Sequence, residues 1–509
     1  MILFSKYKKN DFFWPFIFLV SAILLRLIGI DQVILEGANG RQIQTADITY
    51  NLYQGGFNFL YPQISLLPEP RYFIIEPPIY NTIVATLYKV FGVHETIGRL
   101  VSIFAFAGTT YFIFTLATKY INKSAAKIAV FVFAFSPLSI IYTRSFQPDT
   151  LALFFLTALV FYVSNWFDGE EKAFWPSLLF GLITFLSKPT YMFILISFLI
   201  MGLLIKGKHI LSDIRIYIFA LSTSIPAIAW SFHSRKTSDI FLNNLYSENF
   251  NLDNWVHFST FFNYEFYKTI FSWLSGLILT PVGFTLFLVG LFIKTKQTGD
   301  ILLKSWLIGV ITFDLIFQKH AYTHEYYHLP LLPVASMIIG KAWWFLFENE
   351  NHVKDATRFN LKFFKLFLLV TTLLIIWGYA NSGFKLPRVY GLIEAKIKFF
   401  DNHTEDSDIV ISPTWEALYF SHNKGWRFPL NEKTLIKNYV YFYEDKTPQN
   451  PQIFLLEKFR EQGASYFFVL NSDNFYKNKI LSQYLEINYK KIKSKATKAL
   501  IFDLRKKIS

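Results

Sequence analysis

Apolar runs long enough to cross a lipid bilayer follow one another along most of this 509-residue chain. A membrane-spanning α-helix needs about 20 consecutive, mainly apolar residues. Eleven segments approach this requirement: 12–30, 97–118, 128–143, 150–165, 174–188, 190–205, 214–232, 270–293, 301–317, 329–347 and 363–382. Hydrophobic residues make up 53% of the chain and charged residues only 17%, unlike a soluble domain. The sequence therefore predicts an α-helical polytopic membrane protein with about 11 transmembrane helices.

Basic residues predict which side of the membrane each loop occupies, because short cytoplasmic loops carry an excess of Lys and Arg. Lys6, Lys8 and Lys9 precede the first run and place the N-terminus inside. Later loops expected inside are also basic: Lys119 to Lys127, Lys206 with Lys208, Lys294 with Lys296, and Lys354 with Arg358. Topology thus accounts for the net charge of +14, and we expect no nucleic-acid partner.

The run Ile79–Phe91 is shorter than the others and carries Asn81 and Lys89. These features favour a helix in the outer membrane interface over a span. If Ile79–Phe91 is not counted as a membrane span, the first loop, 31–96, lies on the outer face. The turn YTRSFQPDT and the segment QKHAYTHEYYHLP lie on the same side, so polar residues gather at one face of the bundle.

The composition changes after the last apolar run. Short β-rich runs (DIVISP, ASYFFVL and ALIFDL) alternate with the helical stretch PQIFLLEKFREQGA. This pattern predicts a small α/β domain over 383–509 on the outer face, following a transmembrane domain over 1–382. The chain has no cysteine, which excludes disulfides, a catalytic thiol and thiolate metal sites.

Acidic residues in the first loop are candidates for proton transfer. Asp47 follows Arg41 and Gln44 at helical spacing in RQIQTAD, so Gln44 and Asp47 would share a helix face. A carboxylate there could take the proton of an acceptor hydroxyl. Alternatively, Asp47 lies in a solvated interfacial segment and simply favours a helix N-terminus. Glu36 is a second candidate base.

Two other outer turns carry charged residues. Arg144 and Asp149 belong to RSFQPD, where Pro148 and Asp149 also suit a helix start, so a capping role is as plausible as a functional one. Lys188 in LSKPTY is either a lysine that extends to the interface or a partner for an anion. Asp314 lies inside a predicted span, where a carboxylate needs a partner.

His324, Glu325 and His328 spell the H-E-x-x-H pattern of zinc proteases, which requires both histidines on one helical turn. Pro330 disfavours helical geometry at the residue before it and is at home in the first turn of a helix. HEYYH is therefore expected to precede the next span rather than to form a helix. A membrane zinc protease remains a minor alternative, and no phosphate-binding glycine fingerprint is present.

An ordered set of strings resembles a known family: RQIQTADI, GFNFLYPQI, EPPIYNTIVATLYKVFGVHETIGRLVSI, SPLSIIYTRSFQPDTLALFFL, SKPTY and HEYYHLPLLP. The set, over about residues 10–345, is similar to the GT-C glycosyltransferases of the protein mannosyltransferase and aminoarabinose transferase superfamily. The similarity is greatest to the bacterial family 39, or dolichyl-phosphate-mannose-protein mannosyltransferase-like, branch. The resemblance implies a GT-C fold with exoplasmic juxtamembrane helices in the first loop.

The resemblance also implies an activity. Such enzymes transfer a hexosyl or pentosyl group from a polyprenyl-phosphate donor to an acceptor, with inversion, at the outer face of the bacterial inner membrane. The acceptor would be a glycolipid, a cell-envelope polysaccharide or a protein. The corresponding processes include lipopolysaccharide modification and protein glycosylation. Membrane lipids would be further partners, since they would surround the transmembrane helices. Phosphate leaves readily, so a single base for the acceptor hydroxyl and cations for the phosphate are enough.

The same resemblance implies roles for individual residues. Relatives often have aspartate where this chain has Gln44, and Asp47, one turn on, becomes the first choice for the base. Glu36 is the second choice, and Asp149 matches the second acid of the family. The implied donor-phosphate ligands are Arg41, Arg144, Lys188 and Tyr327, and the implied ligands of a divalent metal (Zn, Mg or Mn) are Glu76 and His324.

A transporter or flippase of polyprenyl-linked sugars is the alternative from another functional class. Transporters concentrate polar residues near the middle of the membrane, in broken helices. This sequence gathers them on one face and adds an outer domain, which favours the transferase.

Overall fold

The computed structural model describes residues 9–36, 39–66, 71–237, 260, 262–349, 358–383, 392–436 and 447–508. The chain forms two compact units. Unit one comprises Met1–Gln32, His94–Phe232 and Phe250–Lys385, and unit two comprises Val33–Val93, His233–Asn249 and Leu386–Ser509. The first loop therefore groups with the C-terminal part of the chain, although the bundle separates them in sequence.

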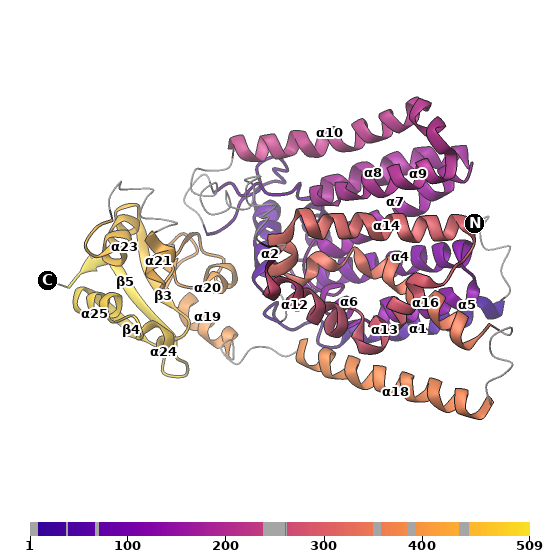
Figure 1. The fold of residues 1–509 in the computed structure, drawn as a ribbon. Helices are drawn as coiled ribbons and strands as arrows, with labels where there is room; N and C mark the ends of the chain where they lie inside the picture. Colours follow the sequence, from indigo (N-terminus) through magenta and orange to yellow (C-terminus); the bar gives the residue numbers. More distant parts are fainter. Residues whose placement is uncertain are drawn as a thin grey trace. The chain divides into compact units, whose positions relative to one another are not determined.

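Unit one is a bundle of helices, most of which run side by side (Figure 1). Its α-helices are α1 (Lys9–Leu27), α4 (Glu95–Tyr120), α5 (Lys123–Phe135), α6 (Pro137–Tyr142), α7 (Asp149–Phe167), α8 (Phe174–Ser187), α9 (Ile194–Lys206), α10 (Ile214–Thr237, in unit one as far as Phe232), α12 (Tyr264–Ser272), α13 (Thr280–Phe292), α14 (Gln297–Ile316), α15 (Gln318–Thr323), α16 (Leu331–Phe347) and α18 (Arg358–Gly383). Shorter helices are η2 (Glu171–Ala173), η3 (Pro189–Phe193), η4 (Gly207–Ser212), the π-helix η7 (Trp273–Ile278) and η8 (Glu325–His328). Every predicted span thus coincides with helical structure.

Among the described residues, four helical segments are long and apolar enough to cross a membrane. They are Glu95–Tyr120, Asp149–Phe167, Pro189–Ser212 and Ile214–Thr237, and a bent helix pair over 264–292 would make a fifth. Shorter apolar helices occupy Phe12–Leu27, Leu331–Phe347 and Lys365–Tyr379. These helices indicate that the chain is a membrane protein. The number of membrane crossings and their orientation stay predictions.

The predicted span 270–293 is broken rather than continuous. The helix axis bends by 106° between its two parts, Tyr264–Ile278 and Thr280–Phe292. Thr280 has a φ angle of 64°, which is rare for a β-branched residue, and Pro281 follows it. A proline disfavours helical geometry at the preceding residue, so the chain turns here. Hydropathy alone does not detect this break, because both parts are apolar.

Small residues allow close packing around α16, the helix that follows HEYYH. Gly340 on α16 faces the backbone of Ala125 and Ala129 on α5, and Gly290 on α13 faces Ile338 on α16. Side chains at these glycines would keep the helices apart, as in many membrane bundles. The glycines therefore fix α16 between α5 and α13.

Unit two contains α2 (Asn39–Gln54) and α3 (Ile79–Phe91) from the first loop. Its C-terminal part contains α19 (Ile393–Asp401), α20 (Trp415–Phe420), α21 (Glu432–Leu435), α23 (Pro451–Glu461), α24 (Ser472–Phe475) and α25 (Lys479–Asn488), with strands β1 (Ile409–Ser412), β2 (Gly425–Arg427), β3 (Ala464–Val469), β4 (Tyr489–Lys493) and β5 (Leu500–Lys507). The sheet has the order β2-β1-β3-β5-β4. Strand β1 pairs in parallel with β2 and β3, and β5 pairs antiparallel with β3 and β4.

The helix predicted over Ile79–Phe91 is present with these bounds, whereas its place in the membrane interface stays a prediction. Asn81 joins it to α2, because its side-chain amide donates to the Thr45 carbonyl at 2.8 Å and to the Thr49 hydroxyl at 3.0 Å. Val90 and Phe91, at its end, are 72% and 65% exposed. Such an apolar end suits a helix that touches lipid.

The first loop and the C-terminal part share contacts within unit two. The backbone N–H of Gly425 on β2 donates to the Ser65 carbonyl at 2.9 Å. The Tyr50 ring on α2 stacks on the His422 ring, with 4.2 Å between their centroids. These contacts connect α2 to the sheet.

Replacing Gly425 should disrupt the sheet, because an added Cβ would lie far inside van der Waals contact with the backbone of Val410 on β1. We expect Gly425→Ala to lower the free energy of unfolding by about 3 kcal/mol or more. Denaturant unfolding of the purified protein measures the loss. The matched control is Gly40→Ala on α2, where nothing lies within 4 Å of the added atom. Equal stability of the two variants would contradict the β1–β2 packing.

Unit two should lose stability in mild acid. Partial burial lowers the pKa of His422 from its usual 6.5, although Asp406 opposes this shift. The unfolded chain therefore takes up the proton first as the pH falls, so this contribution is present above about pH 6.5 and is lost below it. Unfolding measured on both sides of that pH tests the effect. His422→Asn, which tolerates the positive φ of 57°, should flatten the pH dependence, and an unchanged slope would count against His422.

Candidate functional site

A buried ion pair forms the centre of the candidate site in unit one. Lys188 Nζ contacts Asp149 Oδ1, and the two side chains are 12% and 0% exposed. Asp149 is the first residue of α7, and Lys188 follows the last residue of α8 in an extended conformation. The long helical hairpin α7–α8 thus brings together two residues that the sequence singles out separately.

Tyrosine rings surround the Lys188 ammonium. Its Nζ atom lies 4.8 Å from the ring centroid of Tyr327, 5.1 Å from that of Tyr326 and 5.6 Å from that of Tyr191. Aromatic faces attract a cation at such distances. The structure therefore places three of the predicted site residues, Asp149, Lys188 and Tyr327, in one cluster, which we call the Lys188 cluster, with Tyr191 and Tyr326 as further members.

The HEYYH segment builds one wall of the Lys188 cluster. His324 is extended, and Glu325–His328 form a 3₁₀ turn before α16 begins at Leu331. The expectation that HEYYH precedes the span rather than forming a helix is confirmed. Glu325 Oε1 accepts a hydrogen bond of 2.7 Å from the Tyr142 hydroxyl on α6, which fixes the segment.

Asp314, the carboxylate inside a predicted span, has a partner in this segment. His328 Nδ1 lies 3.4 Å from Asp314 Oδ1, and His328 Nε2 donates to the Ala321 carbonyl at 3.0 Å. A charged carboxylate in apolar surroundings is costly unless it is paired. The contact therefore gives Asp314 and His328 a structural role in joining α14 to the HEYYH segment.

Arg144 forms hydrogen bonds with the protein backbone. Its guanidinium donates to the carbonyls of Ile28 and Gly29, at 2.7 and 2.9 Å, just beyond the end of α1. Arg99 on α4 donates to the Ile30 carbonyl at 2.7 Å. These arginines therefore satisfy backbone carbonyls of the turn that follows α1. A phosphate-binding role for Arg144 stays a prediction.

Arg41 and Glu76 in unit two form an ion pair with each other, and their side chains are 19% and 23% exposed. Arg41 also donates to Gln44 Oε1 at 3.3 Å. The family resemblance implies that Arg41 binds the donor phosphate and that Glu76 binds a metal. Gln44 thus supplies a neutral acceptor to Arg41.

Asp47 is buried, and hydrogen bonds hold both of its carboxylate oxygens. Oδ2 accepts from the Ser65 backbone N–H at 2.9 Å, and Oδ1 accepts from the Ser65 hydroxyl at 2.6 Å and the Asn51 amide at 2.8 Å. Burial raises the pKa of Asp47, and the hydrogen bonds from Ser65 oppose this shift. Asp47 therefore fastens α2 to the segment around Ser65, whatever its part in chemistry.

Glu36, the second candidate base, is 4% exposed, and its carbonyl accepts from the Gln42 side chain at 2.8 Å. Asp47 and Glu36 are thus both enclosed within unit two.

The two predicted metal ligands belong to different units and have other partners. Glu76 pairs with Arg41, and the His324 ring stacks on Tyr326 at 5.4 Å. Within the part of the chain that the structure describes, no group of three or more His, Cys, Asp or Glu side chains could hold a metal ion. A divalent metal therefore stays a prediction, and no chemical step is routed through one.

Comparison with known proteins gives one family match, which covers part of the chain. Residues 75–230, which include Glu76, Asp149 and Lys188, match the family model of dolichyl-phosphate-mannose-protein mannosyltransferase. No curated protein matches the chain. The match and the structural similarities below confirm the resemblance to the GT-C glycosyltransferases.

The fold is similar to three solved membrane glycosyltransferase structures at low sequence identity. ArnT from Cupriavidus metallidurans, bound to undecaprenyl phosphate, superposes with a TM-score of 0.65 at 11% identity, over 97% of this chain and 98% of ArnT. The archaeal oligosaccharyltransferase AglB from Archaeoglobus fulgidus, in complex with an inhibitory peptide and a dolichol-phosphate, gives 0.57 at 12%, over 97% and 74%. The arabinofuranosyltransferase AftD from Mycobacteria gives 0.52 at 12%, over 97% and 41%. The chain thus has the GT-C fold.

Sequence reasoning missed several residues of the site. Tyr191 and Tyr326 lie within the strings SKPTY and HEYYH, so a scan for aromatic residues beside the predicted lysine would have found them. Tyr142 and Arg99 gave no such signal, because their partners lie far away in sequence.

Asp47→Asn should weaken unit two before it affects any reaction. The amide offers one acceptor oxygen in place of two, so a buried donor of Ser65 loses its partner, at a cost of about 1–3 kcal/mol. Denaturant unfolding measures this loss. Asp473→Asn is the control, because that carboxylate is 58% exposed and should change stability little. Wild-type stability of Asp47→Asn would contradict the structural role.

Proposed function

We propose that this protein is an inverting glycosyltransferase that transfers a sugar from a polyprenyl-phosphate donor to an acceptor hydroxyl. The reaction takes place at the outer face of a bacterial inner membrane. The observation that carries the proposal is the Lys188 cluster. Its lysine pairs with Asp149 and is faced by tyrosine rings. Lys188 and Asp149 lie in the segment that matches a mannosyltransferase family. The undecaprenyl phosphate bound to ArnT and the dolichol-phosphate bound to AglB support a lipid-linked donor.

Lys188 receives the donor phosphate in this proposal. An ammonium makes strong charge-assisted hydrogen bonds to phosphate oxygens. Asp149 holds the ammonium in place before the donor binds, and the Tyr327 hydroxyl can donate to the same phosphate. The ion pair leaves Asp149 Oδ2 without a hydrogen-bond partner although it is buried, which suits a group that meets a ligand.

Charge development explains why a cation is needed. The bond between the anomeric carbon and the phosphate oxygen breaks, and the phosphate leaves with the bonding electrons. Lys188 stabilises this growing negative charge in surroundings that exclude water, where the interaction is stronger than in solution. No strong general acid is required, because phosphate is a good leaving group.

A carboxylate of the first loop takes the acceptor proton while the acceptor oxygen attacks the anomeric carbon opposite the phosphate. This attack inverts the configuration. Asp47 stays the first candidate, since its raised pKa makes it a better base, but a hydrogen bond from Ser65 or Asn51 must open first. Glu36 is the second candidate. Arg41 can exchange Glu76 for a phosphate oxygen, as both side chains are partly exposed.

Lys188→Met should weaken binding of undecaprenyl phosphate about 10- to 100-fold, because a hydrogen bond to a charged group contributes about 1.5–3 kcal/mol. Binding to the purified protein in lipid nanodiscs measures the effect. Lys172→Met is the matched control, since Lys172 is exposed in the same unit. Unchanged affinity in Lys188→Met would remove Lys188 from the donor site.

Mass spectrometry of glycolipids and glycans from cells with and without the protein tests the activity itself. We expect a sugar modification that disappears without the protein and that Lys188→Met does not restore. Movement of a lipid-linked sugar across the membrane, without any transfer, would support the transporter instead.

A further inference from the structure

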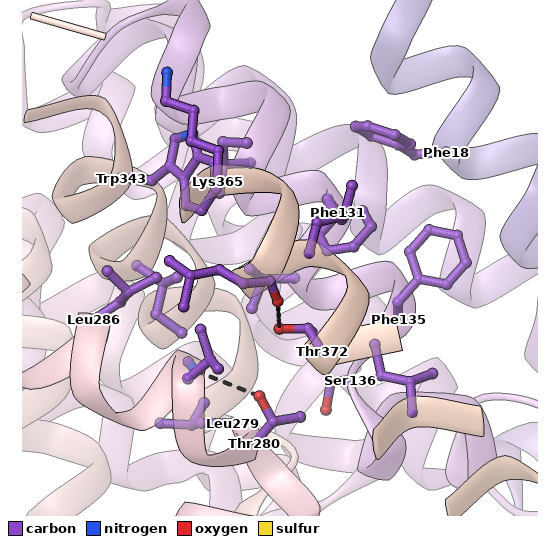
Figure 2. A pocket seen from close by; sticks show the side chains of 18 of the residues that line it. Phe18, Phe131, Phe135, Ser136, Leu279, Thr280, Leu286, Trp343, Lys365 and Thr372 are labelled. Atoms are coloured by element: carbon purple, nitrogen blue, oxygen red, sulfur yellow. Dashed lines mark hydrogen bonds between the residues drawn. The ribbon is translucent and has the colours of Figure 1, made fainter. Parts of the chain in front are cut away.

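An apolar cavity of about 460 Å³, open on one side, lies between helices of unit one (Figure 2). Five helices contribute to its wall: α1, α5, α13, α16 and α18. Among the lining side chains are Phe18, Phe131, Leu286, Trp343 and Ile376. The cavity is separate from the Lys188 cluster, none of whose members lines it.

The few hydroxyls in the wall already have backbone partners. Thr372 donates to the Leu368 carbonyl at 2.8 Å, and Ser136 donates to the Ile278 carbonyl at 2.7 Å. A water molecule needs two to four polar partners, and a dry apolar cavity of only about 150 Å³ can hold benzene. A hydrocarbon is therefore the occupant that this wall fits.

The dimensions match one chain of a membrane lipid. The cavity-lining residues of α18 extend from Lys365 to Ile376, about 16 Å along the helix axis. Half of a bilayer's hydrocarbon core is about 15 Å thick. A single acyl chain of one leaflet thus fits beside α18.

Lys365 supplies a cation at one end of the cavity. Its Nζ donates to the carbonyl of Phe347, the last residue of α16, at 2.7 Å, and a lysine has three donors. Within the described part of the chain no carboxylate pairs with Lys365, and Glu348, next to Phe347, lies 3.9 Å from Lys127. The ammonium can therefore also bind a lipid phosphate.

This end is distant from the donor site. Tyr327 precedes the first turn of α16, whereas Lys365 is bound to its last residue, and the 17 residues of α16 extend about 25 Å. A lipid whose phosphate contacts Lys365 cannot present that phosphate to Lys188. The occupant is a second lipid, not the sugar donor.

We propose that this cavity binds one acyl chain of an anionic phospholipid whose phosphate contacts Lys365. The acyl chain fills the space between α18 and the rest of the bundle. The other face of α18 is open, with Phe363 68% and Trp377 67% exposed, so the helix packs against the bundle on one side only. The bound lipid would hold α18 on that side.

Lipid analysis of the full-length protein tests the proposal. Protein in nanodiscs of phosphatidylglycerol and phosphatidylethanolamine is extracted into mild detergent, and native mass spectrometry identifies the retained lipid. We expect one retained phosphatidylglycerol per chain. Thr372→Phe, which fills the cavity, should remove most of it, and Lys365→Ala should abolish the preference for the anionic lipid. The matched control Leu374→Phe, at a side chain 67% exposed on the same helix, should retain it.

Lys188→Met separates this proposal from the proposed function, since it should lose undecaprenyl phosphate and keep phosphatidylglycerol. Three results would overturn the inference: retention of detergent alone, retention of undecaprenyl phosphate in the cavity, or equal lipid loss in Thr372→Phe and Leu374→Phe.

Discussion

Burial of charge in a bundle of apolar helices is the constraint on which the rest of this structure depends. Removing an ion from water costs several kcal/mol, so each buried charge must find partners within the protein. Asp149 and Lys188 meet this requirement with each other and with tyrosine rings. The pair joins the start of α7 to the end of α8 and gives the bundle one cationic centre. Structure and proposed chemistry thus rest on the same contact.

Other buried charges connect helices instead of forming a site. Arg26 on α1 donates to the hydroxyls of Thr143 and Ser139, at 2.6 and 2.9 Å, and lies 3.7 Å from the ring centroid of Phe106. With Arg144 bound just beyond its end, α1 is held by hydrogen bonds from the α6 region. An arginine on a predicted outer loop therefore need not be a phosphate ligand, since backbone carbonyls also satisfy it.

Hydropathy located the helices of unit one because each run of apolar residues forms its hydrogen bonds within itself, as a bilayer requires. It missed the break at Thr280, which depends on a positive φ and on Pro281 in a region that is apolar on both sides. In unit two, helical spacing placed Gln44 and Asp47 on α2. It could not show that Ser65, eighteen positions further on, would occupy both oxygens of Asp47.

The sequence by itself determined the membrane class, the positions of the helices and the order of motifs that resembles GT-C glycosyltransferases, because these follow from local composition and spacing. Only the tertiary structure decided which charge meets which: Lys188 with Asp149, Arg41 with Glu76, and Arg144 with the carbonyls of Ile28 and Gly29. The physical reason is that a buried polar group bonds to its neighbours in space. Those neighbours can lie far away along the chain, and no local sequence pattern shows which residues they are.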